Sequence, residues 1–85
     1  MDSEEFSFLR LRVVADADPI AIVRVLERFQ NLNILPRKAI AELSTDGIYH
    51  IEIDTVGIAE GVIRNIAAKL AATPCVHTAY WHRVC

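Results

Sequence analysis

The chain has 85 residues, of which 53% are hydrophobic and 24% charged, and its formal net charge is −2. We expect one globular domain over residues 1–85, because this length excludes a second core and this composition excludes a disordered chain. The nearly balanced charge gives no basic surface for nucleic acid or an anionic membrane, and the longest apolar runs are far shorter than the roughly 20 residues of a membrane helix.

The first predicted element is a strand over residues 6–14. Its side chains alternate, with Leu9, Leu11 and Val13 on one face and Arg10 and Arg12 on the other, which is typical of a half-buried strand. The residues before it are acidic and lack the basic and apolar regions of a signal peptide, so we expect a cytoplasmic protein.

A helix follows the first strand after a short loop. Asp18 suits the N-cap, since its side chain can accept bonds from free backbone N–H groups, and Pro19 suits the first helical position because it lacks an N–H. Apolar residues then repeat at the spacing of one buried helical face. These residues are Ile22, Val25, Leu26, Phe29 and Leu32. The helix should end near Leu32, with Asn33 in the left-handed conformation, and its free N-terminal amides offer a place where an anion can bind.

Two strands and an Asp-Gly turn predict a hairpin. The strand over residues 34–44 should lie at an edge, at least at its start, because Pro36 cannot donate to a ladder; Leu35 and Leu43 share one face of it. The strand over residues 48–54 alternates again. Its inward residues are Tyr49, Ile51 and Ile53, and its outward residues are His50, Glu52 and Asp54.

A second helix is predicted over residues 58–72, and a last strand over residues 75–84. The helix should stop before Pro74, and Gly61 within it suggests close packing at that point. The residues expected to be buried on the helix are Val62, Ile63, Ile66 and Leu70. Two faces of the last strand compete for burial, one with Val76, Tyr80 and Val84 and the other with Ala79 and Trp81.

The predicted order of elements is strand, helix, strand, strand, helix, strand. Two right-handed split crossovers of this kind give a four-stranded antiparallel sheet with both helices on one face. The sequence therefore predicts an α+β, ferredoxin-like βαββαβ fold. This scaffold hosts many activities, so the fold alone does not give the function.

Charged residues gather on the predicted outer face of the sheet. Arg10 and Arg12 lie opposite Glu52 and Asp54, with Lys38 and Glu42 farther along. Cross-strand ion pairs explain this pattern better than a catalytic site, which would need a cleft to shift pKa values. The face lacks the aromatic platform of an RNA-recognition module, and no serine, cysteine or lysine stands in an activated context. We therefore expect neither an enzyme nor a nucleic-acid partner.

The histidines and cysteines do not have the spacing of a metal site. They are His50, Cys75, His77, His82 and Cys85, without a close cysteine pair, so we expect no metal and no cofactor. Cys75 and Cys85 would stand roughly 30 Å apart along one strand, whereas a disulfide needs Cα atoms within about 7 Å. Two reduced thiols fit a cytosolic protein.

The order of elements and the stretch Pro19-x-x-Ile22-x-Arg24-Val25-x-x-x-Phe29 resemble the ACT domain, the small ligand-sensing module of amino-acid metabolism. The chain is most similar to the small regulatory subunit of acetohydroxyacid (acetolactate) synthase. The resemblance covers nearly the whole chain, and very short small subunits of that enzyme consist of little more than one such domain.

The resemblance also implies a ligand site. In this family the first strand-to-helix loop and the start of the second strand of a neighbouring domain enclose an effector amino acid. The loop typically reads Asn-x-Pro-Gly, and a later Gly precedes Phe-Asn-Ile. The candidate ligand-binding residues of this chain are Asp16, Ala17, Asp18, Pro19, Ile20 and Leu35.

Several of these positions depart from the family pattern. Ala17 replaces the loop Asn, Ile20 replaces the Gly that lets an effector approach the backbone, and Leu35 replaces the ligand-facing Asn. The loss of two amide side chains removes hydrogen bonds that a buried ligand needs, and Asp16 and Asp18 place negative charge where an effector carboxylate would lie. These departures predict a closed effector site.

Two functions follow from the resemblance. The first is a non-catalytic regulatory subunit that binds a larger biosynthetic enzyme such as acetohydroxyacid synthase. The second is a stand-alone homodimeric sensor that binds an amino acid or a similar small molecule at the dimer interface. Both involve a homodimer, because the high apolar content of so short a chain favours burial against a partner and an edge strand presents unpaired backbone groups.

Overall fold

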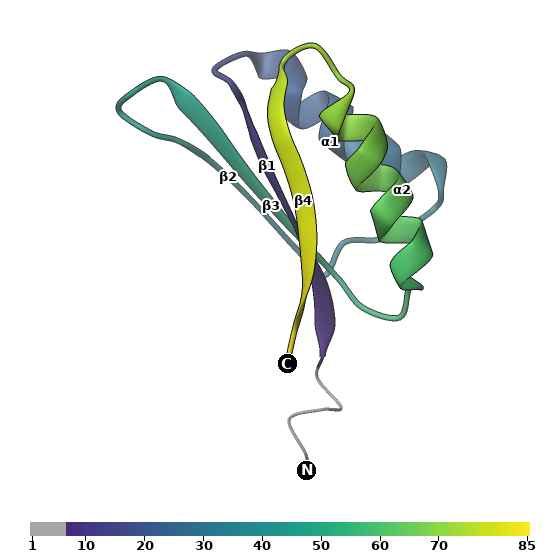
Figure 1. Ribbon diagram of the computed structural model, residues 1–85. Helices are drawn as coiled ribbons and strands as arrows, with labels where there is room; N and C mark the ends of the chain where they lie inside the picture. The colour runs from purple at the N-terminus through teal and green to yellow at the C-terminus, as the bar shows by residue number, and fades with distance from the viewer. Residues whose placement is uncertain (1–6) are drawn as a thin grey trace.

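The computed structural model describes residues 7–85, and the six predicted elements follow one another in the predicted order. The strands are β1 (Phe8–Asp16), β2 (Lys38–Leu43), β3 (Ile48–Thr55) and β4 (Val76–Val84), and the helices are α1 (Pro19–Asn31) and α2 (Glu60–Ala71). The strands form one antiparallel sheet in the order β2-β3-β1-β4, and both helices cover the same face (Figure 1). The predicted ferredoxin-like fold is confirmed. Residue 6, the expected start of the first strand, lies outside the described residues.

The core lies between the sheet and the two helices. Leu9, Leu11 and Val13 of β1 pack beside Ile51 and Ile53 of β3, as their alternation predicted. The helices complete the same cluster with Ala21, Val25 and Phe29 from α1 and with Ile63, Ile66, Ala67 and Leu70 from α2. One shared core fixes the positions of the loops at both ends of the sheet.

The predicted buried face of α1 is partly wrong. The buried residues are Ala21, Val25 and Phe29, whereas Leu26 is 40% exposed and Leu32 is 54% exposed. The buried stripe therefore runs at i, i+4, i+8, and Leu26 falls on a flank of the helix beside the connection that leads to β2. Leu32 is the C-cap and has left the helix. Asn33 has φ 56°, the left-handed conformation expected of it.

The second strand begins four residues later than predicted, at Lys38. The chain is still closing α1 at Ile34, whose backbone N–H donates to the Phe29 carbonyl at 2.9 Å. Pro36 has no N–H to donate, and the Arg37 N–H, which donates to the Asp54 carbonyl at 2.7 Å, is the first to reach β3. Leu35 therefore lies in the connection rather than on the inner face of a strand. The expected edge position of β2 is confirmed.

A β-bulge decides which face of β4 is buried. Ala15 pairs with Val76, but Val14 pairs with Thr78, so β4 has one extra residue at this point. The bulge changes the phase of the alternation, and Val76 turns inward together with Ala79 and Trp81. Residues from both competing sets are thus on the inner face.

Two expectations about single residues in α2 are also corrected, and one residue on the outer face of β3 is more buried than expected. Gly61 is not a point of close packing, since a Cβ added there would meet nothing within 4 Å. Val62 is only half-buried, and Ala67 is buried in its place. Asp54 lies on the outer face of β3 as expected, yet it is 0% exposed, because the Arg10 side chain covers it.

Candidate functional site

The candidate ligand site begins at the loop between β1 and α1. The Asp18 side chain accepts a hydrogen bond from the Ile20 backbone N–H at 3.0 Å, and Pro19 occupies the first turn, so the predicted helix start is confirmed. The Asp18 N–H donates to the Asp16 carbonyl at 2.8 Å, which makes the loop a tight turn. The N-cap carboxylate already fills part of the helix N-terminus and adds negative charge there.

Asp16 ties this loop to the start of β4. Its backbone N–H donates to the Cys75 carbonyl at 2.9 Å, and its carboxylate lies 2.6 Å from His77 Nε2. Both side chains are exposed, so this pair adds little to stability. It does fix the Asp16 carboxylate toward β4 rather than toward α1, and the two candidate aspartates therefore point to different neighbours.

A mostly apolar hollow of about 430 Å³ lies beside the loop. Its lining residues are Ala17, Asp18, Pro19, Ile22, Leu43 and Tyr49. The last three were not among the predicted site residues. For Leu43 and Tyr49, the hairpin turn is the sequence feature that could have predicted this position. The two residues pair next to the turn, and Tyr49 also pairs with Ala15, so both lie at the end of the sheet where β1 ends. We call this cavity the loop hollow.

The other three candidate residues, Asp16 among them, do not line the loop hollow. Ile20 is 39% exposed and is not part of the lining of the hollow. Leu35 is 89% exposed and lies past the opposite end of α1, beside a second hollow of about 290 Å³ next to Leu26. A single chain therefore brings together Ala17, Asp18 and Pro19 but leaves Leu35 at the far end of the helix.

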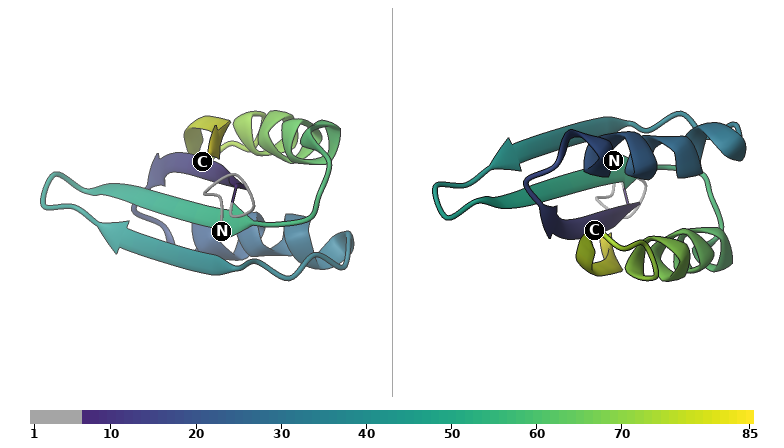
Figure 2. Two further views of the ribbon diagram at one scale, coloured as in Figure 1. Left: turned by 90° about the horizontal axis from the view of Figure 1, so that it is seen from below. Right: turned by 90° about the horizontal axis from the view of Figure 1, so that it is seen from above.

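Between these two hollows runs an apolar surface that no helix covers. Every residue of β2 is exposed, including the inward-facing Ala39, Ala41 and Leu43. The flank of α1 beside it carries Ile22 and Leu26. The hairpin of β2 and β3 extends beyond the helices (Figure 2), which explains why β2 has no cover. We call Ala39, Ala41, Leu43 and Leu26 the β2 surface.

The outer face of the sheet carries the predicted ion pairs. Arg10 Nε donates to Asp54 Oδ1 at 2.8 Å and Nη2 donates to Oδ2 at 3.2 Å, and Arg12 pairs with Glu52 at 3.1 Å. The hydrogen bond to Asp54 raises the pKa of Arg10 above its ordinary value. Phe8 lies beside the Arg10 guanidinium, 5.4 Å from ring centroid to Cζ. A closed network of this kind stabilises the sheet and leaves little for chemistry.

The histidines, cysteines and acidic residues of the described part of the chain do not gather into a metal-binding cluster. Across residues 7–85, no group of three His, Cys, Asp or Glu side chains lies close enough to hold a metal ion. Cys75 and Cys85 are free thiols at opposite ends of β4. None of the helices in that range has the length and apolar character needed to cross a membrane.

Comparison with known proteins relates the chain to solved structures only. No family model matches it, and no curated protein sequence matches it. The C-terminal domain of the MgtC protein from Mycobacterium tuberculosis is 17% identical, with a TM-score of 0.74 over 99% of this chain and 94% of that one. The ACT domain of GTP pyrophosphokinase from Chlorobium tepidum is 16% identical, with a TM-score of 0.72 over 89% of this chain and 99% of that one.

A homoserine dehydrogenase from Thiobacillus denitrificans contains a similar unit. It is 17% identical, with a TM-score of 0.73, and the match covers 91% of this chain but only 17% of the dehydrogenase. The fold therefore occurs both as a separate domain and as a small part of a longer enzyme chain. This chain shares the fold of the ACT domain.

Proposed function

We propose that this chain is a non-catalytic regulatory subunit or domain of the ACT type, which acts in amino-acid metabolism by binding a larger biosynthetic enzyme. The observation that carries the proposal is the β2 surface, an apolar edge that a partner would cover. The fold is shared with an ACT domain, and in the dehydrogenase it accompanies a much longer chain. An enzyme of the acetohydroxyacid synthase kind is the partner that the sequence resemblance favours.

The β2 surface supports a homodimer as the functional unit. β2 has one neighbour, β3, and its other edge presents unpaired backbone groups. In an antiparallel pair of β2 strands, the second copy would be inverted. The Leu35 end of one copy would then lie near the loop hollow of the other. Pairing would thus bring Ala17, Asp18, Pro19 and Leu35 to one interface, whereas Asp16 would remain with His77 of β4 and Ile20 would lie outside the hollow. Each half of the interface would bury apolar side chains that are exposed in one chain.

The alternative function is a homodimeric sensor of amino acids. The loop hollow favours it, because Ile20 is not part of its lining and a space of about 430 Å³ remains beside the loop. Against it stands the Asp18 carboxylate, which lines the hollow and would repel the carboxylate of an amino acid. Leu43 and Tyr49 supply apolar contacts, while few groups there would pair with an ammonium and a carboxylate together.

Reconstitution with a catalytic chain tests the proposal. Purified acetohydroxyacid synthase catalytic subunit should bind the wild-type chain and change its activity, whereas Leu43→Glu, which places a charge on the β2 surface, should lose both effects. Arg64→Glu, on an exposed position of α2, is the matched control and should behave as wild type. An enzyme whose activity is the same with and without the chain would contradict this choice of partner.

A thermal-shift panel separates the two functions. A ligand at 100 times its dissociation constant stabilises the folded state by about 2.7 kcal/mol, which raises the melting temperature of a domain of this size by roughly 10 °C. Twenty amino acids at about 10 mM would thus reveal any site tighter than about 0.1 mM. We expect no selective shift. A clear response to one amino acid would replace the subunit function with the sensor.

A further inference from the structure

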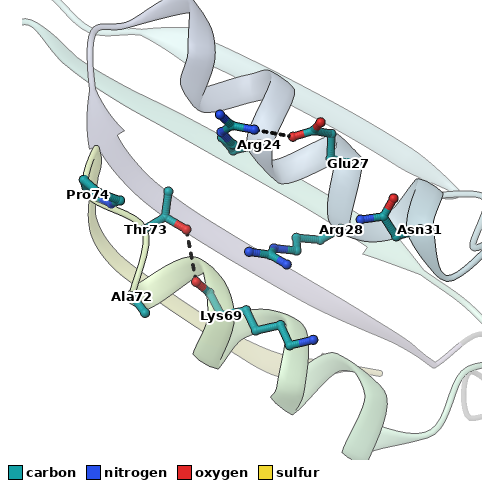
Figure 3. A pocket seen from close by; sticks show the side chains of 8 residues that line it. All are labelled: Arg24, Glu27, Arg28, Asn31, Lys69, Ala72, Thr73 and Pro74. Atoms are coloured by element: carbon teal, nitrogen blue, oxygen red, sulfur yellow. Dashed lines mark hydrogen bonds and ion pairs between the residues drawn. The ribbon is translucent and has the colours of Figure 1, made fainter.

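A groove between α1 and α2 gathers positive charge in an otherwise acidic chain. It has a volume of about 680 Å³ and lies on the side of α1 opposite the β2 surface. The polar residues that line it are Arg24, Glu27, Arg28, Asn31, Lys69 and Thr73. Figure 3 shows Arg28 reaching from α1 into the space between the helices and Lys69 on α2 across from it, while the Arg24–Glu27 pair runs along α1. Three cations and one carboxylate give the groove a net positive charge, whereas the chain carries −2.

Two of the three cations in the groove have no anionic partner among residues 7–85. Arg24 Nη1 pairs with the only lining carboxylate, that of Glu27, at 3.0 Å. Arg28 and Lys69 make no ion pair and no side-chain hydrogen bond within residues 7–85, although Arg28 is half-buried. By contrast, Arg10 and Arg12 are both paired with carboxylates.

The helix dipoles do not account for this arrangement. Arg28 and Lys69 each lie in the last turn of their own helix, where a positive charge is favourable. That effect is local to each helix end and does not require the two side chains to line one groove. Two like charges that face one cavity repel each other, and partial burial of Arg28 adds a desolvation cost. An anion bound between them would offset the repulsion and give the Arg28 guanidinium a counter-charge.

We propose that this groove binds the phosphates of a small diphosphate compound, either inorganic pyrophosphate or a nucleoside diphosphate. Arg28 and Lys69 would contact the phosphate oxygens, since guanidinium and ammonium groups form strong charge-assisted bonds with them, and Asn31 supplies a further amide donor. The volume is in the range of small-molecule sites. The site is independent of the loop hollow and of the β2 surface, so it does not depend on the proposed regulatory function.

Isothermal titration calorimetry at constant ionic strength tests the proposal with two probes, pyrophosphate and ADP. We expect saturable binding at one site per chain. The double variant Arg28→Gln/Lys69→Gln should weaken it at least tenfold, or about 1.4 kcal/mol. The control Arg64→Gln/Lys38→Gln has the same net charge, but both of its positions are exposed and lie outside the groove. It should change the dissociation constant less than about twofold. Tighter binding of ADP than of pyrophosphate would indicate a nucleotide, and equal binding would indicate recognition of the phosphates alone.

Amide chemical shifts on titration locate the site independently of the variants. Pyrophosphate should move the signals of residues 24–31 and 69–73 and leave those of β2 unchanged. Three results would overturn the proposal: no saturation by about 10 mM of either probe, equal weakening by the control variant, or shifts mainly outside residues 24–31 and 69–73. Binding of a poly-glutamate peptide without binding of either diphosphate would also overturn it, and would indicate docking of an acidic protein.

Discussion

The buried pair of Arg10 and Asp54 gives the sharpest test of the structure. Asp54 is 0% exposed on the outer face of the sheet, and both of its carboxylate oxygens accept hydrogen bonds from one guanidinium, at 2.8 and 3.2 Å. Arg10→Gln would leave this carboxylate buried without its counter-charge. It would also leave Glu52, which lies 3.4 Å from Arg10, as a nearby negative charge.

The expected cost of Arg10→Gln is about 3 to 5 kcal/mol. Hydrogen bonds to charged groups contribute about 1.5–3 kcal/mol each, and breaking a buried ion pair by removing one partner costs about 3–5 kcal/mol. Because the Arg10 side chain keeps 21% of its exposure, water can partly replace it, and the lower end of the range applies. A loss of about 3 kcal/mol lowers the melting temperature of a domain of this size by roughly 15 °C.

Urea denaturation at pH 7 measures this loss, with two further variants as controls. Arg12→Gln makes the same change on the same strand, but Arg12 is 45% exposed, so we expect a loss below about 1 kcal/mol. The double variant Arg10→Gln/Asp54→Asn removes the unpaired charge and should be more stable than Arg10→Gln alone. Equal losses for Arg10→Gln and Arg12→Gln, or no recovery in the double variant, would refute the burial of Asp54.

Three other predictions concern the core, the helix start and the hairpin turn. Phe29→Ala should lower the free energy of unfolding by about 3–5 kcal/mol, because Phe29 is fully buried, and Leu26→Ala should lower it by less than half as much. Chemical denaturation measures both losses, and equal losses would contradict the observed burial of one face of α1. Asp18→Ala should cost about 1 kcal/mol through loss of the N-cap, and Asp18→Asn should restore most of it, which the same denaturation curves would measure. Hydrogen bonds from Ser44 and from the backbone N–H of Ile48 lower the pKa of Asp46. The ionised Asp46 carboxylate should therefore stabilise the fold at neutral pH, and this stabilisation should be lost as the pH falls through the lowered pKa. A carboxyl NMR titration that gives Asp46 an ordinary pKa of about 3.9 would contradict this.

The sequence by itself determined the elements, their order and the local signals that begin and end them. Asp18 and Pro19 start α1 where they were expected to, Asn33 ends it, and the Asp-Gly turn joins β2 to β3. Each of these signals acts through bonds or backbone conformations that span only a few residues, so a short stretch of sequence contains all of its cause. The order of the elements then leaves few topologies, and the fold follows.

Only the tertiary structure decided what covers each element. Leu26 belongs to the apolar repeat of α1 but lies on an exposed flank beside the connection that leads to β2, and the inner face of β4 depends on a bulge opposite Val14 and Ala15. Asp54 is buried by an arginine 44 residues away, and Arg28 meets Lys69 in one groove only because α1 and α2 lie on the same face of the sheet. Burial and charge pairing depend on contacts between residues far apart in the chain, and periodicity within one element contains no information about them.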